Sequence, residues 1–222
     1  MIRKAHQLGY HLIAIPLSES FSRDEIQQLR RVCKEERIDF ASRIDLAPKT
    51  PEGLIKSIRQ MRRRFEIVAV ACKSKKVARQ AAKDRRVDIL NFPFYVSRRR
   101  FFDKAEAELA SNALTCFEID IKPLLILEGP ARIRLLSSLR REVGVAERFQ
   151  VPIVVSSGAT HELLMRRPRD TAALTSLFDL SPPSSVQAIC TDPAAIVRRN
   201  REKLDPRFIA PGVRLIRRGR DC

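Results

Sequence analysis

Short apolar runs alternate along the chain with segments in which apolar residues recur every three or four positions. The apolar runs predict buried strands at residues 10–16, 38–46, 65–72, 87–91, 116–121 and 151–156. The periodic segments predict helices near residues 22–36, 50–63, 75–83, 103–111, 130–150, 170–178 and 193–203. This alternation is typical of a parallel sheet with right-handed crossovers. Six such units favour a closed barrel over an open sheet, so the predicted fold is an α/β, TIM-barrel-like fold.

Local signals mark where several helices begin. Ser22 and Glu25 have the spacing of a capping box, and Thr50 precedes a proline at the first position of its helix. Further starts are predicted with Asp170 as an N-cap and at Asp192–Pro193.

Charge is the most unusual property of the composition. The chain has 43 Lys and Arg against 26 Asp and Glu, a formal net charge of +17. Such an excess causes self-repulsion and favours a polyanionic partner, nucleic acid first and an anionic membrane second, although a solvated basic surface is the simpler alternative. We expect one domain over residues 1–222, with a basic tail from about residue 205. Residues 213–216 in that tail are predicted to form a final strand or an arm.

No targeting or membrane segment is visible in the sequence. There is no run of about 18 apolar residues and no signal peptide, so we expect a cytoplasmic protein that does not cross a membrane. The five cysteines are scattered and show no C-x-x-C spacing, which argues against a zinc site and a disulfide framework.

Enzyme signatures are weak. The three histidines His6, His11 and His161 lack metal-ligand spacing, and there is no nucleotide-binding glycine motif. Glu118 and Asp120 point to one side of a strand, either as paired acids or in a salt bridge with a neighbouring Arg or with Lys122.

Basic residues gather in four segments. Residues 59–86 contain eleven Lys or Arg and two acids, and the last 25 residues contain nine Lys or Arg and three acids. Arginine also clusters at 98–100 and 166–169, and the guanidinium group pairs with phosphate in two-point geometry. Aromatic residues flank the first of these clusters and would suit stacking on unpaired bases, although they could equally belong to the core: Phe92, Phe94, Tyr95, Phe101 and Phe102.

Five segments, in order, resemble the archaeal ribonuclease P protein component 3 family. They are VDIL at 87–90, FEIDIKPLL at 117–125, VPIVVSSGA at 151–159, LMRRPRD at 164–170 and DPAAIVRRNREKL at 192–204. The resemblance implies a TIM-barrel-like fold related to the polymerase and histidinol phosphatase phosphoesterases, without their metal ligands. Members of this family usually begin with an additional strand, so the barrel of this chain is expected to lack its first strand.

The resemblance also implies a function. The family supports an RNA that cleaves 5′ leaders from precursor tRNA, and component 3 pairs with component 2 on the catalytic half of that RNA. The protein is then expected to have no catalytic residues and to bind no metal or cofactor, with Mg²⁺ acting through the catalytic RNA. Other ribonuclease P proteins are expected partners in the particle. The alternatives are a metal-dependent phosphoesterase and a protein–protein adaptor.

The basic residues then become candidate contacts. The predicted RNA-binding set is Arg98, Arg99, Arg100, Lys122, Ser156, Ser157, Gly158, Arg166, Arg169, Arg198 and Arg199. Within this set the serine–glycine turn is expected to offer backbone N–H groups to a phosphate. The helix that carries Arg132, Arg140 and Arg141 is the predicted surface for the partner protein.

Overall fold

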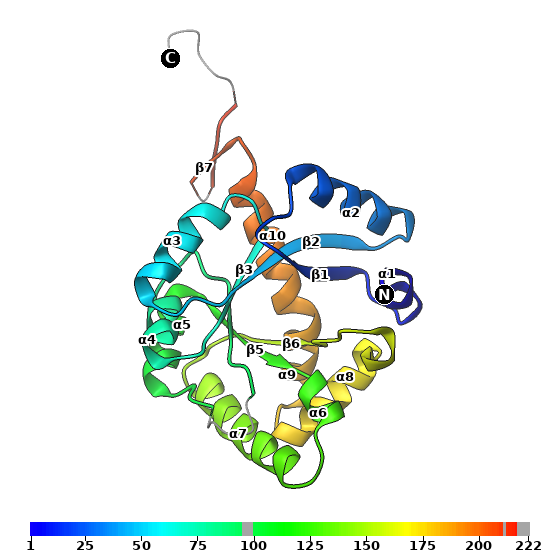
Figure 1. Cartoon of the computed structure of the whole chain (residues 1–222), viewed down its shortest axis with the longest axis vertical. Coiled ribbons are helices and arrows are strands. Elements are labelled where there is room, and N and C mark those ends of the chain that lie inside the picture. Colours follow the sequence, from blue (N-terminus) through cyan, green and yellow to red (C-terminus); the bar gives the residue numbers. More distant parts are fainter. Residues whose placement is uncertain (95–99, 211, 217–222) are drawn as a thin grey trace.

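A computed structural model describes residues 1–94, 100–210 and 212–216 of the chain (Figure 1). Its main sheet consists of six strands, β1 (Leu12–Leu17), β2 (Asp39–Leu46), β3 (Ile67–Ala71), β4 (Ile89–Asn91), β5 (Cys116–Asp120) and β6 (Ile153–Ser156). The strands are parallel, and each pairs with the next one along the chain. The sheet curls into a half-barrel, which confirms the prediction of a TIM-barrel-like fold that lacks a strand.

Helices connect the strands. They are α1 (Ile2–Gln7), α2 (Arg23–Glu35), α3 (Pro51–Met61), α4 (Lys75–Ala82), α5 (Lys104–Ala113), α6 (Lys122–Ile126), α7 (Gly129–Arg148), α8 (Pro168–Thr175), α9 (Pro182–Val186) and α10 (Asp192–Leu204). After α10 comes a small antiparallel hairpin of β7 (Phe208–Ala210) and β8 (Val213–Arg214), which projects from the body (Figure 1). The prediction of a strand within 213–216 is therefore confirmed for its first two residues.

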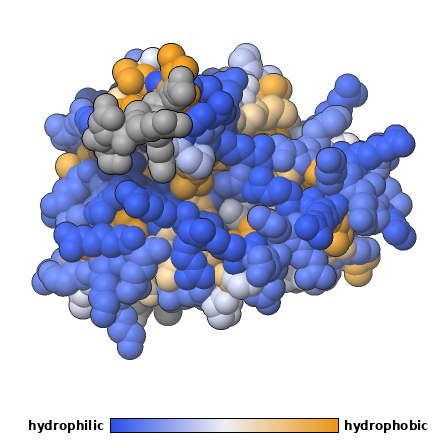
Figure 2. Space-filling model, turned by 90° about the horizontal axis from the view of Figure 1, so that it is seen from above, coloured by the Kyte–Doolittle hydropathy of each residue, from blue (hydrophilic) through white to orange (hydrophobic). Residues whose placement is uncertain are grey.

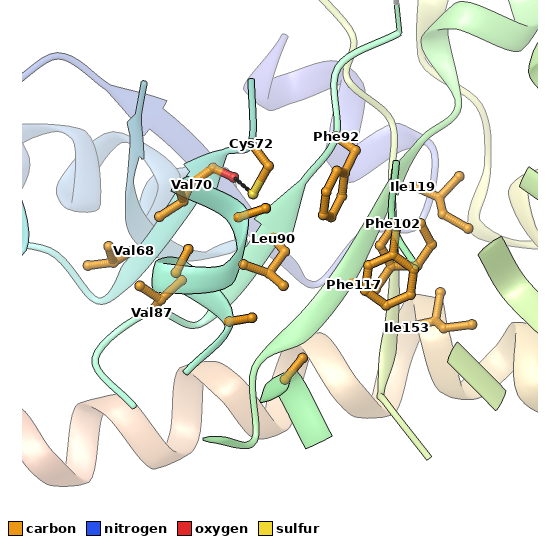
Figure 3. Packing of buried hydrophobic residues seen from close by; sticks show 14 of the residues in the cluster. Val68, Val70, Cys72, Val87, Leu90, Phe92, Phe102, Phe117, Ile119 and Ile153 are labelled. Atoms are coloured by element: carbon orange, nitrogen blue, oxygen red, sulfur yellow. Dashed lines mark hydrogen bonds between the residues drawn. The ribbon is translucent and has the colours of Figure 1, made fainter. Parts of the chain in front are cut away.

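Alternate residues of each strand face opposite sides of the sheet. On the convex side, strand residues such as Val68, Leu90, Phe117 and Ile153 pack against the buried faces of the flanking helices (Figure 3). Phe102 stacks on Phe117 with ring centroids 4.5 Å apart. Burial of this apolar layer is the main stabilising contribution to the half-barrel.

The concave side is lined differently at its two ends. Near the amino ends of the strands it is apolar and holds Ala41, Ala69 and Ile89, against which Ile196 and Val197 of α10 pack. The small alanine side chains let a helix approach the sheet closely. Helix α10 therefore covers the amino-terminal part of the concave face (Figure 1).

Several predicted helix starts are confirmed in detail. Ser22 and Glu25 form a reciprocal capping box at α2, and Thr50 caps α3 by accepting a hydrogen bond from the Gly53 N–H. The prediction for Asp170 is wrong, because Arg167 occupies the N-cap position of α8 and Asp170 lies in its first turn.

The last helix also differs from the prediction. The chain is already helical from Pro182, through α9 and a π-helical segment (Gln187–Thr191), before it continues as α10. Pro193 lacks an N–H group and its ring crowds the carbonyl group four residues earlier. The wider π turn accommodates the proline without ending the helix. Helix α6 and helix α9 are each five residues long and showed no periodic pattern in the sequence.

Candidate functional site

An ion pair crosses the concave face near the carboxyl ends of the strands. Arg43 on β2 donates two hydrogen bonds to Glu118 on β5, with N···O distances of 2.5 and 2.7 Å, and a third to Asp45 at 2.6 Å. The side chain of Glu118 is fully buried and that of Arg43 is 10% exposed. Burial alone would raise the pKa of Glu118, but the charge and hydrogen bonds of Arg43 outweigh it, so this pKa is lowered.

A second carboxylate joins this centre. Asn91 on β4 donates to both Glu118 and Asp120, at 2.9 Å each, and Ser156 on β6 donates to Asp120 at 2.6 Å. Burial and the nearby negative charge of Glu118 raise the pKa of Asp120. Glu118 and Asp120 thus belong to one polar network, and the prediction of a salt bridge holds with Arg43 as the partner instead of Lys122.

The donor set of this centre does not fit a metal site. The guanidinium group of Arg43 already supplies the positive charge that Glu118 faces, and the remaining carboxylate oxygens accept hydrogen bonds from Asn91 and Ser156. Within residues 1–94, 100–210 and 212–216, no group of three or more His, Cys, Asp or Glu side chains is arranged to hold a metal ion.

The predicted serine–glycine turn lies at the rim of this network. The N–H groups of Ile121 and Lys122 donate to the carbonyl groups of Ser156 and Ser157, which joins the ends of β5 and β6. Gly158 has a positive φ of 55°, and a Cβ atom there would lie 3.2 Å from the Cβ of Asp120. Glycine is therefore required by both the backbone conformation and the close approach. The structure brings Lys122 and the turn together.

The arginine loop that follows β6 packs against the start of the chain: the Tyr10 hydroxyl donates to the carbonyl group of Arg166 at 2.9 Å, and the amino terminus pairs with Glu162 at 2.7 Å. Arg169 is exposed in the first turn of α8, and Arg166 donates to the carbonyl groups of Leu163 and Met165. Within the described part of the chain, no carboxylate lies within 4 Å of either guanidinium group. Both side chains can therefore reach a phosphate.

The arginine cluster at 98–100 has a different outcome. Arg98 and Arg99 lie outside the described residues. Arg100 is buried, pairs with the fully buried Glu142 at 2.7 Å and also donates to the carbonyl group of Phe92. The structure therefore gives the side chain of Arg100 a role inside the protein, with only 6% of it exposed to a ligand.

The aromatic residues around that cluster are core residues where the structure describes them. Phe92 and Phe102 are buried, and Phe101 packs edge-on against Phe92 with centroids 5.3 Å apart. Phe94 is partly buried against the same layer, and Tyr95 lies outside the described residues. Of the two alternatives for these rings, a place in the core holds for Phe92 and Phe102, because their faces are used within the protein.

Arg198 and Arg199 lie at the opposite, amino-terminal end of the strands. Arg198 is exposed, whereas Arg199 donates to the buried Asp88 at 3.0 Å and to the carbonyl group of Leu114. Arg62 reaches the other oxygen of Asp88 from α3 at 2.5 Å. Burial lowers the pKa of Lys203 on α10, and the charges of Arg199 and Arg62 lower it further. The predicted RNA-binding residues are thus divided between two ends of the molecule.

A buried glutamate anchors the same end. Glu66, next to β3, accepts hydrogen bonds from Arg30 of α2 at 2.9 Å and from Arg201 of α10 at 2.6 Å, and also from the N–H of Ser42. Arg201 in addition pairs with Asp39. Arg30, Glu66 and Arg201 are far apart in the sequence, so the spacing of apolar residues within single helices and strands could not predict that they pair.

The predicted partner-binding residues lie along one exposed helix. Arg132, Arg140 and Arg141 are exposed on α7, where Arg140 donates to the carbonyl group of Leu177 and Arg132 to that of Leu127. Exposed Ile126 and Ile133 flank Arg132 in the chain. The surface is thus both basic and apolar.

Sequence reasoning missed Arg43 and Asn91. The sequence does contain an indication for Arg43. It lies two residues before Asp45 in a mostly buried strand, so both side chains point to the same face, and a buried charge at such a position needs a partner. Asn91 stands at the end of a short strand and carries no signal that separates it from a turn residue.

Comparison with known proteins places this fold in a family. Residues 1–205 match the profile of a family described as RNase P subunit p30. The chain is 30% identical over 216 residues to ribonuclease P protein component 3 of Methanosarcina barkeri, covering 97% of this chain and 87% of the relative. It is 27% identical to the protein of the same description from Methanopyrus kandleri, covering 96% and 90%.

One solved structure supports the fold independently. A chain in a cryo-EM structure of archaeal ribonuclease P with mature tRNA superposes with a TM-score of 0.87 at 23% identity, covering 98% of this chain and 94% of the other.

In the part of the chain that the structure describes, no helix combines the length and apolar character needed to cross a bilayer.

Proposed function

The chain belongs to the RNase P subunit p30 family, and from that premise we propose that it binds and stabilises the ribonuclease P RNA, which removes 5′ leaders from precursor tRNA. The chain is a subunit of ribonuclease P. In this proposal the RNA performs the hydrolysis with its Mg²⁺ ions, in the cytoplasm, and the protein supplies positive charge.

The observation that carries the proposal is the set of basic side chains left without an acid partner in the segments that follow β5 and β6. Lys122 adjoins the turn at 156–158, and Arg166 and Arg169 follow this turn in the chain; the described residues place no carboxylate within 4 Å of their charged groups. The acids of this end are hydrogen-bonded: Glu118 is buried and accepts from Arg43, and Asp120 is half-buried and accepts from Ser156. A phosphate that approaches this rim therefore meets cations and backbone, with the negative charges of Glu118 and Asp120 held below the surface.

Partner proteins are assigned to a different surface. We place component 2 on the exposed face of α7 with Arg132, Arg140 and Arg141, because Ile126 and Ile133 add exposed apolar area there. Other ribonuclease P proteins and precursor tRNA are contacts within the assembled particle.

A salt series tests the proposal. Purified protein, with and without component 2, is titrated with ribonuclease P RNA and with an unrelated structured RNA of equal length. We expect tighter binding to ribonuclease P RNA, strengthened by component 2, with an affinity that falls steeply as salt increases because neutralised phosphates release counterions. Equal and weak binding to both RNAs would contradict the proposal.

A matched pair of double variants tests the surface. R166Q/R169Q removes two cations from the proposed rim, whereas R31Q/R148Q removes two exposed cations from other helices. We expect the first variant to bind ribonuclease P RNA about tenfold more weakly and to lower the salt slope by about two, one for each lost phosphate contact. The control variant should change the affinity by less than about twofold. Equal losses in the two variants would show that only total charge matters.

A further inference from the structure

A hollow opens at the amino-terminal end of the half-barrel, away from the rim at residues 156–158. It has a volume of about 720 Å³, within the roughly 300–1,000 Å³ usual for ligand sites. Its walls come from α2, from β2, from the segment just before β3, from the end of α10 and from the turn that leads into β7. Seen from above, over the end that carries the hairpin, the molecule presents a predominantly hydrophilic surface with small hydrophobic patches (Figure 2).

Four arginines line the hollow against two carboxylates. Arg30, Arg64, Arg201 and Arg207 face Glu66 and Asp205. Both oxygens of Glu66 are already occupied, one by Arg201 and the other by Arg30 and Ser42, and the side chain is only 6% exposed. Glu66 therefore fixes the directions of two guanidinium groups and presents little negative charge to a ligand.

The remaining two arginines are held in different ways. Arg64 donates to the carbonyl groups of Glu19 and Phe21, at 3.0 and 2.7 Å, and the described residues offer it no carboxylate within 4 Å. Arg207 pairs with Asp205 at 3.1 Å, and its side chain is 67% exposed. The hollow thus keeps excess positive charge on side chains whose positions are set by the protein.

Apart from Ser42, the rest of the wall is apolar. Ile26 of α2 lies on one side, and Leu204 and Pro206 lie on the other. A site with guanidinium groups beside an aliphatic surface matches a ligand that is anionic at one end and flat and apolar at the other. A nucleotide has both features, since its phosphate pairs with arginine and its base packs against aliphatic side chains or stacks on a guanidinium plane.

We infer that this hollow binds one unpaired nucleotide of the RNA, with its phosphate against Arg30, Arg64 and Arg207 and its base against Leu204 and Pro206. The inference rests on the proposed RNA-binding function and adds a second contact at the end of the molecule opposite the rim at 156–158. Unpaired nucleotides are the elements of RNA that proteins bind in pockets, because the base is free to leave the stack.

Photo-crosslinking to the full-length protein tests the site. Ribonuclease P RNA that contains 4-thiouridine is irradiated with the protein, and the adducts are mapped by mass spectrometry. We expect an adduct in the peptide that contains Leu204 and Pro206. The variant R30Q/R207Q should reduce this adduct and weaken binding about tenfold, whereas R31Q/R148Q should keep both within about twofold of the parent.

Stability is monitored for each variant, because Arg30 also supports the buried Glu66. R207Q alone serves as a second variant, since Arg207 is exposed and pairs with Asp205. Loss of the adduct in R207Q at an unchanged melting temperature supports the site. An unchanged adduct and affinity in R207Q and R30Q/R207Q would overturn the inference, as would an adduct that maps only to other peptides.

The two proposals fail in different ways. If the parent protein does not prefer ribonuclease P RNA, the proposed function fails, and the hollow is not an RNA site. If the parent shows that preference and R166Q/R169Q weakens it while R30Q/R207Q does not, only the inference about the hollow is wrong.

Discussion

Both ends of the half-barrel carry arginine–carboxylate networks, but the arginines come from different parts of the fold. At the carboxyl end, Arg43 belongs to a strand and pairs with Glu118 across the concave face, where both side chains are buried. At the amino end, Arg199 and Arg201 reach in from α10, and their side chains remain 31% and 34% exposed. The first network holds strands together, whereas the second attaches a helix.

The difference shows how a very basic protein can fold before it meets a polyanion. Arginines that pair with buried acids, such as Arg43 and Arg100, no longer contribute free positive charge to the surface. Arginines without acid partners in the described chain, such as Arg166 and Arg169, do contribute it. Charge content therefore predicts the class of partner, and pairing decides which residues are available to that partner.

The largest expected effect is at the carboxyl end. E118Q should lower the free energy of unfolding by about 3–5 kcal/mol, because it leaves the buried guanidinium group of Arg43 with only Asp45 as a charged partner. Urea denaturation measures the change. The double variant R43M/E118L should recover most of the loss, since apolar side chains of similar volume avoid the desolvation of both charges. A loss that persists in the double variant would show that the pair itself is not the cause.

A smaller effect is expected at the amino end. D88N should cost about 1–3 kcal/mol, because the partly exposed Arg62 and Arg199 can turn to solvent when the carboxylate is lost. Since this network attaches α10, amide hydrogen exchange should accelerate in α10 more than in β5. If D88N destabilised the protein as much as E118Q and accelerated exchange evenly, the distinction between the two ends would not hold.

The turn at the carboxyl end provides a third test. G158A should cost about 1–2 kcal/mol, because alanine is strained at a φ of 55° and its Cβ would press on Asp120. Thermal denaturation measures the loss. G144A is a suitable control, since Gly144 lies within α7 with nothing within 4 Å of an added Cβ, and alanine there should be neutral or stabilising. Equal effects in the two variants would contradict the close packing over Asp120.

The smallest effect is a change in pH dependence. Because the folded pKa of Asp120 is raised, the folded state binds a proton more tightly than the unfolded chain does. That contribution to stability is complete below the unfolded value of about 3.9 and is lost as the pH rises through the folded pKa. D120N removes the titration, so its stability relative to the parent should improve as the pH rises above about 4. The pKa of Glu118 is lowered, so its contribution to the free energy of unfolding is lost as the pH falls. A pH-independent difference between D120N and the parent would show that Asp120 does not titrate in this way.

Much of the architecture could be predicted from local patterns. The six strands, the capping box at Ser22 and the buried face of α7 at Leu135, Leu139 and Val143 follow from apolar periodicity and from hydrogen-bonding groups within four residues of each other. The short helices α6 and α9 were missed because five residues are too few to show a period. The π turn before Pro193 was missed because proline ordinarily marks a helix start.

The sequence by itself determined the class of fold, the excess of positive charge and the segments that resemble the family, because all of these are properties of composition or of neighbouring residues. Only the tertiary structure decided which arginines are free. Arg43 and Glu118 are 75 residues apart, and Arg201 and Glu66 are 135 apart, so their pairing depends on the curl of the sheet and on the path of α10 across it. The strength of each pair depends on burial, since water screens an exposed ion pair and a folded interior does not.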